Sequence, residues 1–561
     1  CSRASVSMVA PTSLESAPTV ERRLWDRDAF LRGYENSAEL QAQHLACPEL
    51  PKDLLGTYYR NGHARFVSRD GRKVRHPFDA DGMVCAVTLD GRSGTAVVRQ
   101  RYVASQGAIK ERVAGRSLYP GQFGNARPFW DGGANFKNLA NTGVMWHGGK
   151  LLALWEGSRP HVLDPLSLAT MGEYDVEGLV GNGPTDSFSA HPRDTPEGGK
   201  ANFAFFGNPA TGKTKIRFWD FQADSFTLRS TPQTHEVPGF GLYHDFLVTD
   251  SWFIVTAAPS TWGSGGFESV RGTLEWIAGK RTVVSMIEFD VTKPTVAYFF
   301  PRDERSGAQP VAIELDTFFS FHHANAFEDP STGEVIFDTV LSEQLAVDDR
   351  SLGLEDSDLF IIEQLDYESE VPQTALIRYT IDVSSGQYTK RRLSSRQVEF
   401  PSVAPSVRSK EHRYIYCSTA AKAEGVSPYA GVLKVDTQDA SLSQFWLPEP
   451  HQFCGEAIFV PRSGTTTEDD GYILTLCFDG HEGTSTLLVL DALHLNQGPI
   501  ARVQIPSSLA MGAGEDATIA GPGHGLHGTW AAGLVPSYDE VRQAESARKA
   551  IGARFLSDIV S

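Results

Sequence analysis

Short runs of apolar, β-branched and aromatic residues recur along the whole chain, and tight-turn residues separate them. Asp-Gly pairs fall at 70–71, 81–82, 90–91, 131–132, 470–471 and 479–480, beside Asn61-Gly62. Such pairs favour the two-residue turns of β-hairpins. The runs predict strands at Val84–Leu89, Ala96–Tyr102, Leu151–Trp155, Ala201–Phe206, Trp252–Ala257, Val283–Phe289, Glu334–Thr339, Ala375–Ile381, Arg413–Tyr416, Gly431–Val435, Tyr472–Phe478 and Ser485–Asp491. The pattern predicts an all-β protein.

Helical patterns are few. Asp28–His44 has helix-forming residues and an amphipathic face, and Gly107–Gly115 fits a short helix. Ser537–Ile551 is the strongest case, because Ser537 can cap its first turn and charged residues can face solvent.

No low-complexity linker divides the 561 residues, so we expect a single β-domain over residues 26–561. Many short strands without a break are typical of a β-propeller or a large barrel, although no repeated signature gives the number of blades. Residues 1–25 are expected to be a disordered tail or the remnant of an organelle transit peptide, since residues 1–20 are rich in Ser, Ala, Thr and Pro. The expected location is a plastid or the cytoplasm.

Charge and composition exclude several classes of protein. A formal charge of −18, spread along the chain, argues against nucleic acid as the main partner. The six cysteines form no Cys-x-x-Cys pair, so free thiols are expected. No apolar run approaches the ~18 residues of a membrane span. We therefore expect a protein that does not span a bilayer but can touch its surface.

Four short stretches place a histidine beside strongly apolar or aromatic residues. They are Ser189–Pro192, Tyr243–Phe246, Phe321–Glu328 and His527–Trp530. A buried imidazole must be hydrogen-bonded or bound to a metal, and neutral imidazoles suit iron, zinc, copper and nickel. A closed repetitive scaffold could gather these four stretches around one ion. Spacing alone leaves His323 and His524 as alternative ligands in the third and fourth stretches.

The chain resembles the carotenoid cleavage oxygenases, which include apocarotenoid, carotenoid and stilbene dioxygenases and the retinoid isomerase of the eye. The resemblance covers about Leu55 to Gly533. Its motifs, in addition to the four histidine stretches in the right order, are Gly56–Gly62, His76–Met83, Lys137–Thr142 and Leu151–Gly157.

This resemblance implies a seven-bladed β-propeller, with a dome of loops and short helices over its top face, and a non-haem Fe(II) held by four histidines. The motif Phe-x-Phe-His-x-x-Asn-Ala-x-Glu selects His322, and His-Gly-Thr selects His527. The implied ligands are His191, His244, His322 and His527.

Three glutamates are implied as hydrogen-bond partners of these ligands. They are Glu156, Glu399 and Glu456, and their expected partners are His244, His322 and His527 respectively. Ligating histidines commonly give their second N–H to a carboxylate. Thr142 matches the residue whose methyl group crowds one open position on the iron.

The implied reaction is O₂-dependent cleavage of a C=C bond in an apocarotenoid or carotenoid, giving two carbonyl products. A stilbenoid substrate is the alternative, and Tyr102 and Lys137 could then bind its phenol. A propeller that only binds a partner protein is the non-enzymatic alternative. An apolar stretch is expected to dip into a bilayer surface; it contains Leu118, Tyr119, Pro120, Phe123, Phe129 and Trp130. The oligomeric state stays open.

Overall fold

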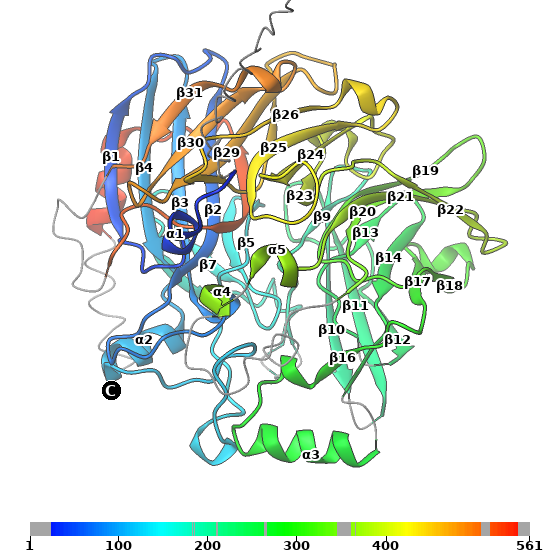
Figure 1. Ribbon diagram of the computed structural model, residues 1–561. Coiled ribbons are helices and arrows are strands. Elements are labelled where there is room, and N and C mark those ends of the chain that lie inside the picture. The colour runs from blue at the N-terminus through cyan, green and yellow to red at the C-terminus, as the bar shows by residue number, and fades with distance from the viewer. Residues whose placement is uncertain are drawn as a thin grey trace, which may run out of the picture.

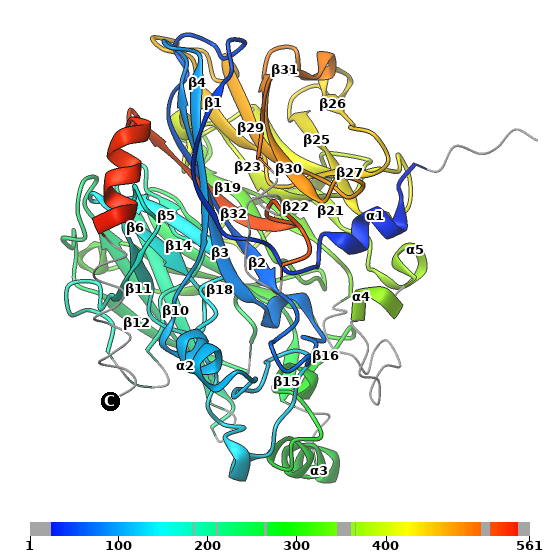
Figure 2. The same ribbon diagram turned by 90° about the vertical axis from the view of Figure 1, so that its left-hand side faces the viewer.

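The strands of the chain form a ring of antiparallel sheets in the computed structural model (Figures 1 and 2). The structure describes residues 24–547, except 182, 184–185, 209–210, 240, 263–265, 345–360, 365 and 507–516. The expectation for residues 1–25 therefore lies almost entirely outside the described residues.

Seven sheets, numbered here as blades in chain order, make up the ring in the described part of the chain. Blade 1 contains β1 (Leu40–Ala46), β2 (Leu55–Arg65), β3 (Asp81–Asp90), β4 (Thr95–Tyr102) and β32 (Gly525–Ala532). Blade 2 contains β5 (Gly143–His147), β6 (Lys150–Leu154), β7 (His161–Leu163) and β8 (Thr170–Glu173). Blade 3 contains β9 (Arg193–Asp194), β10 (Lys200–Asn208), β11 (Lys213–Phe221) and β12 (Gln233–Pro238).

The remaining blades follow the same plan. Blade 4 contains β13 (Leu247–Val248), β14 (Trp252–Ala257), β17 (Thr295–Pro301) and β18 (Val311–Leu315). Blade 5 contains β19 (His323–Glu328), β20 (Val335–Leu341), β21 (Ala375–Ile381) and β22 (Tyr388–Arg392). Blade 6 contains β23 (Val398–Ser402), β24 (Tyr414–Ala420), β25 (Tyr429–Asp436) and β26 (Gln444–Trp446). Blade 7 contains β27 (Gln452–Cys454), β28 (Ile458–Pro461), β29 (Gly471–Asp479), β30 (Thr484–Asp491) and β31 (Pro499–Gln504).

The Asp-Gly pairs at 90–91 and 479–480 lie at turns between neighbouring strands as predicted, whereas Asn61-Gly62 lies within β2 and Asp81-Gly82 begins β3. Between β3 and β4, the carboxylate of Asp90 accepts from the backbone N–H of Arg92 at 3.0 Å and from the hydroxyl of Ser93 at 2.8 Å. Gly94 closes this turn at a φ of +67°, a conformation that favours glycine. Such turns keep sequential strands antiparallel within one blade.

The two ends of the described chain close the ring. The C-terminal strand β32 pairs antiparallel with β2, and Arg60 of β2 lies opposite Gly528 of β32. Because blade 1 is built from both ends, the fold completes only when the C-terminal strand is in place.

Apolar side chains fill every gap between neighbouring blades. The seven clusters pair blades 1 and 2, 2 and 3, and so on around the ring to 7 and 1, within the described residues. Between blades 1 and 2, for example, Tyr59 and Val84 pack against Leu151 and Ala153. The core is therefore distributed around the ring, which leaves the axis free for polar side chains.

Helices lie on the connections. They are α1 (Arg27–Arg32), α2 (Gln106–Ala114), α3 (Gly266–Ile277), α4 (Ile361–Gln364) and α5 (Tyr367–Glu370). Both views place α2 and α3 at the same end of the molecule (Figures 1 and 2). A two-stranded sheet of β15 (Ser260–Trp262) and β16 (Ile287–Phe289) lies between β14 and β17 in the sequence.

Two of the three predicted helices are present. The helix α2 overlaps the predicted 107–115 region but begins and ends one residue earlier, and the last helix begins at residue 538 and continues to the end of the described chain. Ser537 caps this last helix, because its hydroxyl accepts from the N–H of Glu540 at 3.3 Å.

The helix predicted over Asp28–His44 is wrong in its second half. The helix α1 ends at Arg32, and residues 40–46 form β1, which pairs with β4 at the edge of blade 1. A Cβ at Gly33 would lie 2.3 Å from the ring of His524, so close packing here requires glycine. The predicted strand Val283–Phe289 is also shorter, because Val284–Met286 is a 3₁₀ turn that precedes β16.

Two findings in the described residues bear on the expectations from composition. No described helix is long and apolar enough to cross a membrane. The five described cysteines are all buried free thiols.

Candidate metal centre

Four blades each bring one histidine to the axis of the ring. His191 lies two residues before β9, His244 three residues before β13, and His322 directly before β19. His527 lies within β32. These are the first strands of blades 3, 4 and 5 and the closing strand of blade 1, so one edge strand in each of four blades brings its histidine to the same place.

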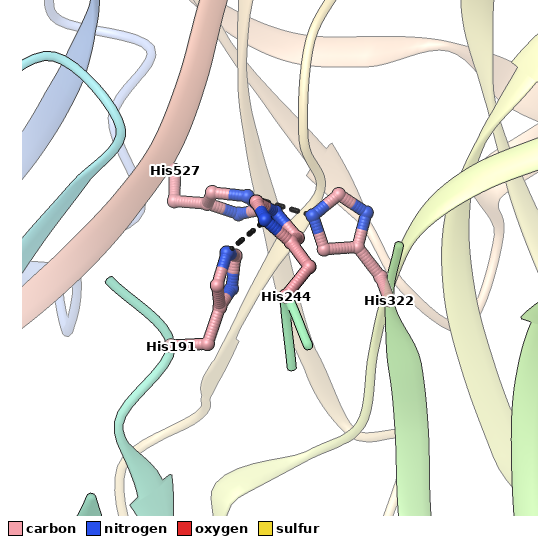
Figure 3. A group of neighbouring side chains, drawn as sticks. All are labelled: His191, His244, His322 and His527. Atoms are coloured by element: carbon pink, nitrogen blue, oxygen red, sulfur yellow. Dashed lines mark hydrogen bonds between the residues drawn. The ribbon is translucent and has the colours of Figure 1, made fainter. Parts of the chain in front are cut away.

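The four imidazoles face one another (Figure 3). One ligand atom from each lies within 4.8 Å of those of the others. Nε2 of His191 is 2.8 Å from Nε2 of His244, and Nε2 of His527 is 3.0 Å from Nε2 of His322. The side chains are buried or nearly so. Neither Asp, Glu nor Cys enters this group in the described residues.

The three blades that supply no histidine each supply a glutamate. Glu156 follows β6 of blade 2, Glu399 lies in β23 of blade 6, and Glu456 lies between β27 and β28 of blade 7. Each of the seven blades therefore contributes one of these histidines or glutamates to the hub.

Each glutamate accepts the second N–H of one imidazole. The Nδ1 atoms of His244, His322 and His527 lie 2.7 Å from Glu156, 2.5 Å from Glu399 and 2.9 Å from Glu456. These are the expected pairings. A carboxylate at Nδ1 fixes the tautomer that leaves the Nε2 lone pair free toward the centre.

The electrostatics favour neutral rings at His191 and His527, whereas at His244 burial opposes the charged form but Glu156 more than offsets it, so the pKa of His244 is raised. Burial, together with the facing rings of His244, His527 and His322, holds the pKa of His191 well below its ordinary value. Burial also lowers the pKa of His527 to about 4, although Glu456 works against this shift. Neutral imidazole is the form that binds metals.

The arrangement fits a metal ion. Two nitrogens at right angles on an ion with bonds of about 2.0–2.1 Å would be about 2.9 Å apart, and the two Nε2 pairs are 2.8 and 3.0 Å apart. Four inward lone pairs, backed by three carboxylates, form a metal site.

Comparison with known proteins agrees with this geometry. The family model described as retinal pigment epithelial membrane protein matches residues 34–531. The chain belongs to the carotenoid cleavage oxygenase family. The apocarotenoid-15,15'-oxygenase of Synechocystis is 32% identical over 93% of this chain and 99% of its own length. The lignostilbene-α,β-dioxygenase isozyme III of Sphingomonas paucimobilis is 29% identical over 86% of this chain and 92% of its own.

Solved structures give the same result for the fold. The crystal structure of cobalt-substituted apocarotenoid oxygenase from Synechocystis superposes with a TM-score of 0.79 at 30% identity, and the match covers 91% of this chain and all of that one. The seven-bladed propeller predicted from the family resemblance is confirmed.

His323 and His524, the two alternative ligands left open by spacing, have other partners. Nδ1 of His323 is 2.8 Å from the hydroxyl of Thr339, and Nε2 of His524 donates to the carbonyl of Phe30 at 2.8 Å. The structure thus separates them from the group of four.

Thr142 lies directly beside the metal site. Its backbone carbonyl accepts from the N–H of His527 at 3.1 Å, and its hydroxyl donates to the amide oxygen of Asn141 at 3.0 Å. The hydroxyl is therefore occupied within its own loop.

Aromatic rings lie against the histidines of the metal site. Phe321 packs edge-on to His244 at 5.2 Å between ring centroids, and Phe400 lies 5.3 Å from the ring of His322. Phe78 links Phe321 to Phe123 of the 118–130 segment. The surroundings of the metal site are therefore apolar on this side.

Phe400 is a feature that the sequence reasoning did not single out. Its φ is +51°, a left-handed conformation that is costly for a phenylalanine. Its backbone N–H donates to Glu399 at 2.5 Å. The only sequence signal is the run Glu399-Phe400-Pro401, since an aromatic residue between a buried acid and a proline is unusual in a strand.

Tyr102 and Lys137 do not meet at the metal site. The hydroxyl of Tyr102 lies 2.7 Å from the carbonyl oxygen of Ser37 and 2.9 Å from that of Ala64. Nζ of Lys137 lies between Asp81, at 2.7 Å, and Glu111, at 2.5 Å. Burial opposes the charge of Lys137, but the two carboxylates more than offset it, so its pKa is raised.

A cavity of about 550 Å³ opens along the axis and reaches His191, His322 and His527. Residues of all seven blades line it. Ion pairs such as Lys200 with Asp194, at 2.6 Å, make part of its wall polar. Phe400 also lines this cavity, so polar and aromatic side chains share its wall.

Proposed function

We propose that the chain is a non-haem Fe(II) dioxygenase that cleaves one C=C bond of an apocarotenoid or carotenoid. Both atoms of O₂ enter the products, so one alkene and one O₂ give two carbonyl compounds. The observation that carries the proposal is the group of four inward imidazoles, in which the three glutamates contact the Nδ1 atoms of the rings and not the centre itself.

The relatives support this reaction class. The first of them is an apocarotenoid-15,15'-oxygenase that matches nearly the whole of both chains. A carotenoid 9,10(9',10')-cleavage dioxygenase of Arabidopsis thaliana is 26% identical over 82% of this chain. The cobalt-substituted structure of this relative supports a site that accepts a transition metal.

His191, His244, His322 and His527 would hold the iron, and a ferrous ion bound there supplies activation of O₂. Glu156, Glu399 and Glu456 orient three of the four rings and keep their inner nitrogens unprotonated. The methyl group of Thr142 would restrict which open position small molecules can reach.

Phe321 and Phe400 supply the apolar walls for an alkene. Aromatic faces contact a polyene over a large area without requiring a hydrogen bond from it, and they exclude water from the reacting bond. No dissociable organic cofactor is needed for this chemistry.

The occupied polar groups favour the polyene over a phenol. A phenolic substrate needs free groups that hold and deprotonate its hydroxyl. Tyr102 is already placed against two backbone carbonyls, and Lys137 is already paired with two carboxylates. We therefore assign neither residue to substrate binding in the proposed reaction.

We further propose contact with a membrane surface, from which an apolar substrate would be taken. The exposed apolar side chains at the α2 and α3 end are Val113, Trp130, Val270 and Leu274, and Trp130 is 75% exposed. This differs from the predicted stretch, since Pro120 is buried and Phe129 packs on Trp276 at 4.8 Å. These four side chains come from three segments of the chain, and Trp130 alone represents the predicted one.

The test is product analysis under ¹⁸O₂. Iron-loaded protein is incubated with a panel of apocarotenals and, separately, with resveratrol. We expect ¹⁸O in both carbonyl products of an apocarotenal and no turnover of resveratrol. Cleavage of resveratrol alone would assign the phenolic activity instead. No cleavage of either class after Fe(II) loading would refute the proposal.

A further inference from the structure

A buried arginine lies next to the metal site. Arg60 of β2 is 1% exposed, and its Nη1 donates to Oε2 of Glu456 at 3.3 Å. The same carboxylate accepts from Nδ1 of His527 at 2.9 Å and from the backbone N–H of Gly528 at 2.8 Å. Glu456 therefore bridges Arg60 and the imidazole of His527.

The other two glutamates of the hub have no such partner. In the described residues, Glu156 and Glu399 form ion pairs only with His244 and His322. Only one of the three glutamates is therefore paired with an arginine. The metal centre as a whole gains a single positive charge from Arg60.

The guanidinium is placed there at a cost. Its Nε and Nη2 are buried and make no hydrogen bond, and unpaired buried donors are uncommon in folded proteins. Hydrogen bonding alone therefore does not explain why an arginine occupies this position.

Two glycines leave room for the guanidinium of Arg60. A Cβ at Gly455 would lie 2.5 Å from Nη2 of Arg60, and a Cβ at Gly525 would lie 2.7 Å from Nε. Gly455 directly precedes Glu456, and Gly525 lies two residues before His527 in the sequence. The chain thus leaves space for a guanidinium between a glutamate and the histidine it orients.

The charge balance of the metal centre explains why an arginine occupies this position. Three carboxylates around a divalent ion leave one negative charge uncompensated, and Arg60 supplies its counterpart. The nearby pair of Arg193 and Asp245 is neutral as a pair, so it does not change this sum. With a trivalent ion the same centre would carry a net positive charge, which a buried site disfavours.

We propose that Arg60 is a positioning residue of the metal centre, which holds Glu456 against His527 and makes the buried centre neutral with a divalent ion, so that it favours the divalent over the trivalent state. The inference deepens the proposed function and rests on it for the identity of the metal. It does not depend on which alkene is cleaved.

The experiment is a redox titration of the iron-bound protein, followed by electron paramagnetic resonance, with cobalt in a parallel series. Arg60→Met removes the charge and keeps much of the volume. We expect it to shift the preference for divalent over trivalent iron by about tenfold or more toward the trivalent state, about 59 mV for a one-electron couple. Arg60→Lys keeps the positive charge, so its potential should lie close to that of the unmodified protein.

Two further variants separate charge from structure. Glu456→Gln should shift the potential in the opposite direction, and Arg60→Met with Glu456→Gln should return it close to that of the unmodified protein, because the total charge is then unchanged. The double variant also leaves no unpaired buried charge, so it remains informative if Arg60→Met does not fold.

The matched control is Arg99→Met. Arg99 is also 1% exposed in blade 1, but it donates to Thr88 at 3.1 Å and to the carbonyl of Pro165 at 2.8 Å, away from the metal site. Its loss should lower thermal stability and leave the potential unchanged. Equal potentials in Arg60→Met and the unmodified protein, or equal shifts in Arg60→Met and Arg99→Met, would overturn the inference. Absence of alkene cleavage would instead count against the proposed function alone.

Discussion

Nδ1 of His322 lies 2.5 Å from Oε2 of Glu399, which is the shortest of the three contacts between an imidazole and a glutamate at the hub. The two residues come from neighbouring blades 5 and 6. Glu399 also accepts the N–H of Phe400. This single carboxylate thus orients a ligand ring and fixes the backbone that presents an aromatic wall.

Replacement of Glu399 by glutamine should weaken metal binding about 10–100-fold, as for other outer partners of metal ligands. Gln can keep a hydrogen bond but loses the charge that makes the imidazole a stronger donor to the metal. The measurement is competition with a chelator, with bound metal read by mass spectrometry. The exposed Glu424, changed to Gln, is the control; equal affinity of the two variants would contradict the role of Glu399.

Phe400 gives a prediction about stability. Because its φ of +51° is costly for any residue with a Cβ, Phe400→Gly should be more stable than Phe400→Ala by about 1 kcal/mol. Both variants remove the same ring, so their difference isolates the backbone. Urea unfolding monitored by tryptophan fluorescence measures it.

The order should reverse at a residue of ordinary strand conformation. Phe445 of β26 is 47% exposed, and there Gly should be less stable than Ala because glycine weakens strands. If Ala were the more stable residue at position 400 as well, the left-handed backbone would not be a source of strain.

Buried histidines away from the metal should destabilise the fold in acid. Burial lowers the pKa of His63 to about 3, of His76 to about 3 and of His161 to about 4, from 6.5. Below pH 6.5 the unfolded chain therefore binds more protons than the folded one, and each group costs about 2 kcal/mol of stability by pH 5. Burial raises the pKa of Asp79 to about 6, and this acts in the opposite direction with about 1 kcal/mol.

His76→Asn should recover about 2 kcal/mol of that loss at pH 5 relative to pH 7. Asn can replace the acceptor that Nδ1 of His76 offers to the N–H of Phe78 at 3.2 Å, and it does not titrate. Urea midpoints at the two pH values measure the difference. The exposed His44, changed to Asn, is the matched control for loss of one imidazole; the same pH response in both variants would argue against the buried ring as the cause.

The histidines and glutamates of the hub could be predicted because each lies in a short motif that resembles those of the carotenoid cleavage oxygenases. Spacing alone leaves His323 as an alternative to His322, whereas the family resemblance selects His322 and implies Glu399 as its partner. Arg60 and Phe400 escaped the same reasoning, because their roles depend on neighbours from other blades. The pairing of Arg60 with Glu456 joins residues that are 396 positions apart, and no local pattern encodes it.

The fold shows the same division. Turn residues and alternating runs place most strands, since hairpins are local. Residues 40–46 have good helix formers, yet they pair with β4 as an edge strand, because tertiary pairing can override local preference. The exposed apolar side chains at this end could not be predicted from the sequence either, since they belong to α2, α3 and the turn at Trp130.

Trp130 and Leu274 should together control binding to lipid. Both are strongly exposed, at 75% and 61%, and both lie at the α2 and α3 end of the molecule. A double change to Ser removes apolar area that would enter the headgroup region, so it should lower the fraction of protein that sediments with phosphatidylcholine liposomes several-fold. Leu442, which is 53% exposed on the connection between β25 and β26, is the control, and Leu442→Ser should bind like the unmodified protein. Equal sedimentation of all three proteins would place membrane contact elsewhere or exclude it, whereas loss in the double variant alone would locate the lipid-facing end.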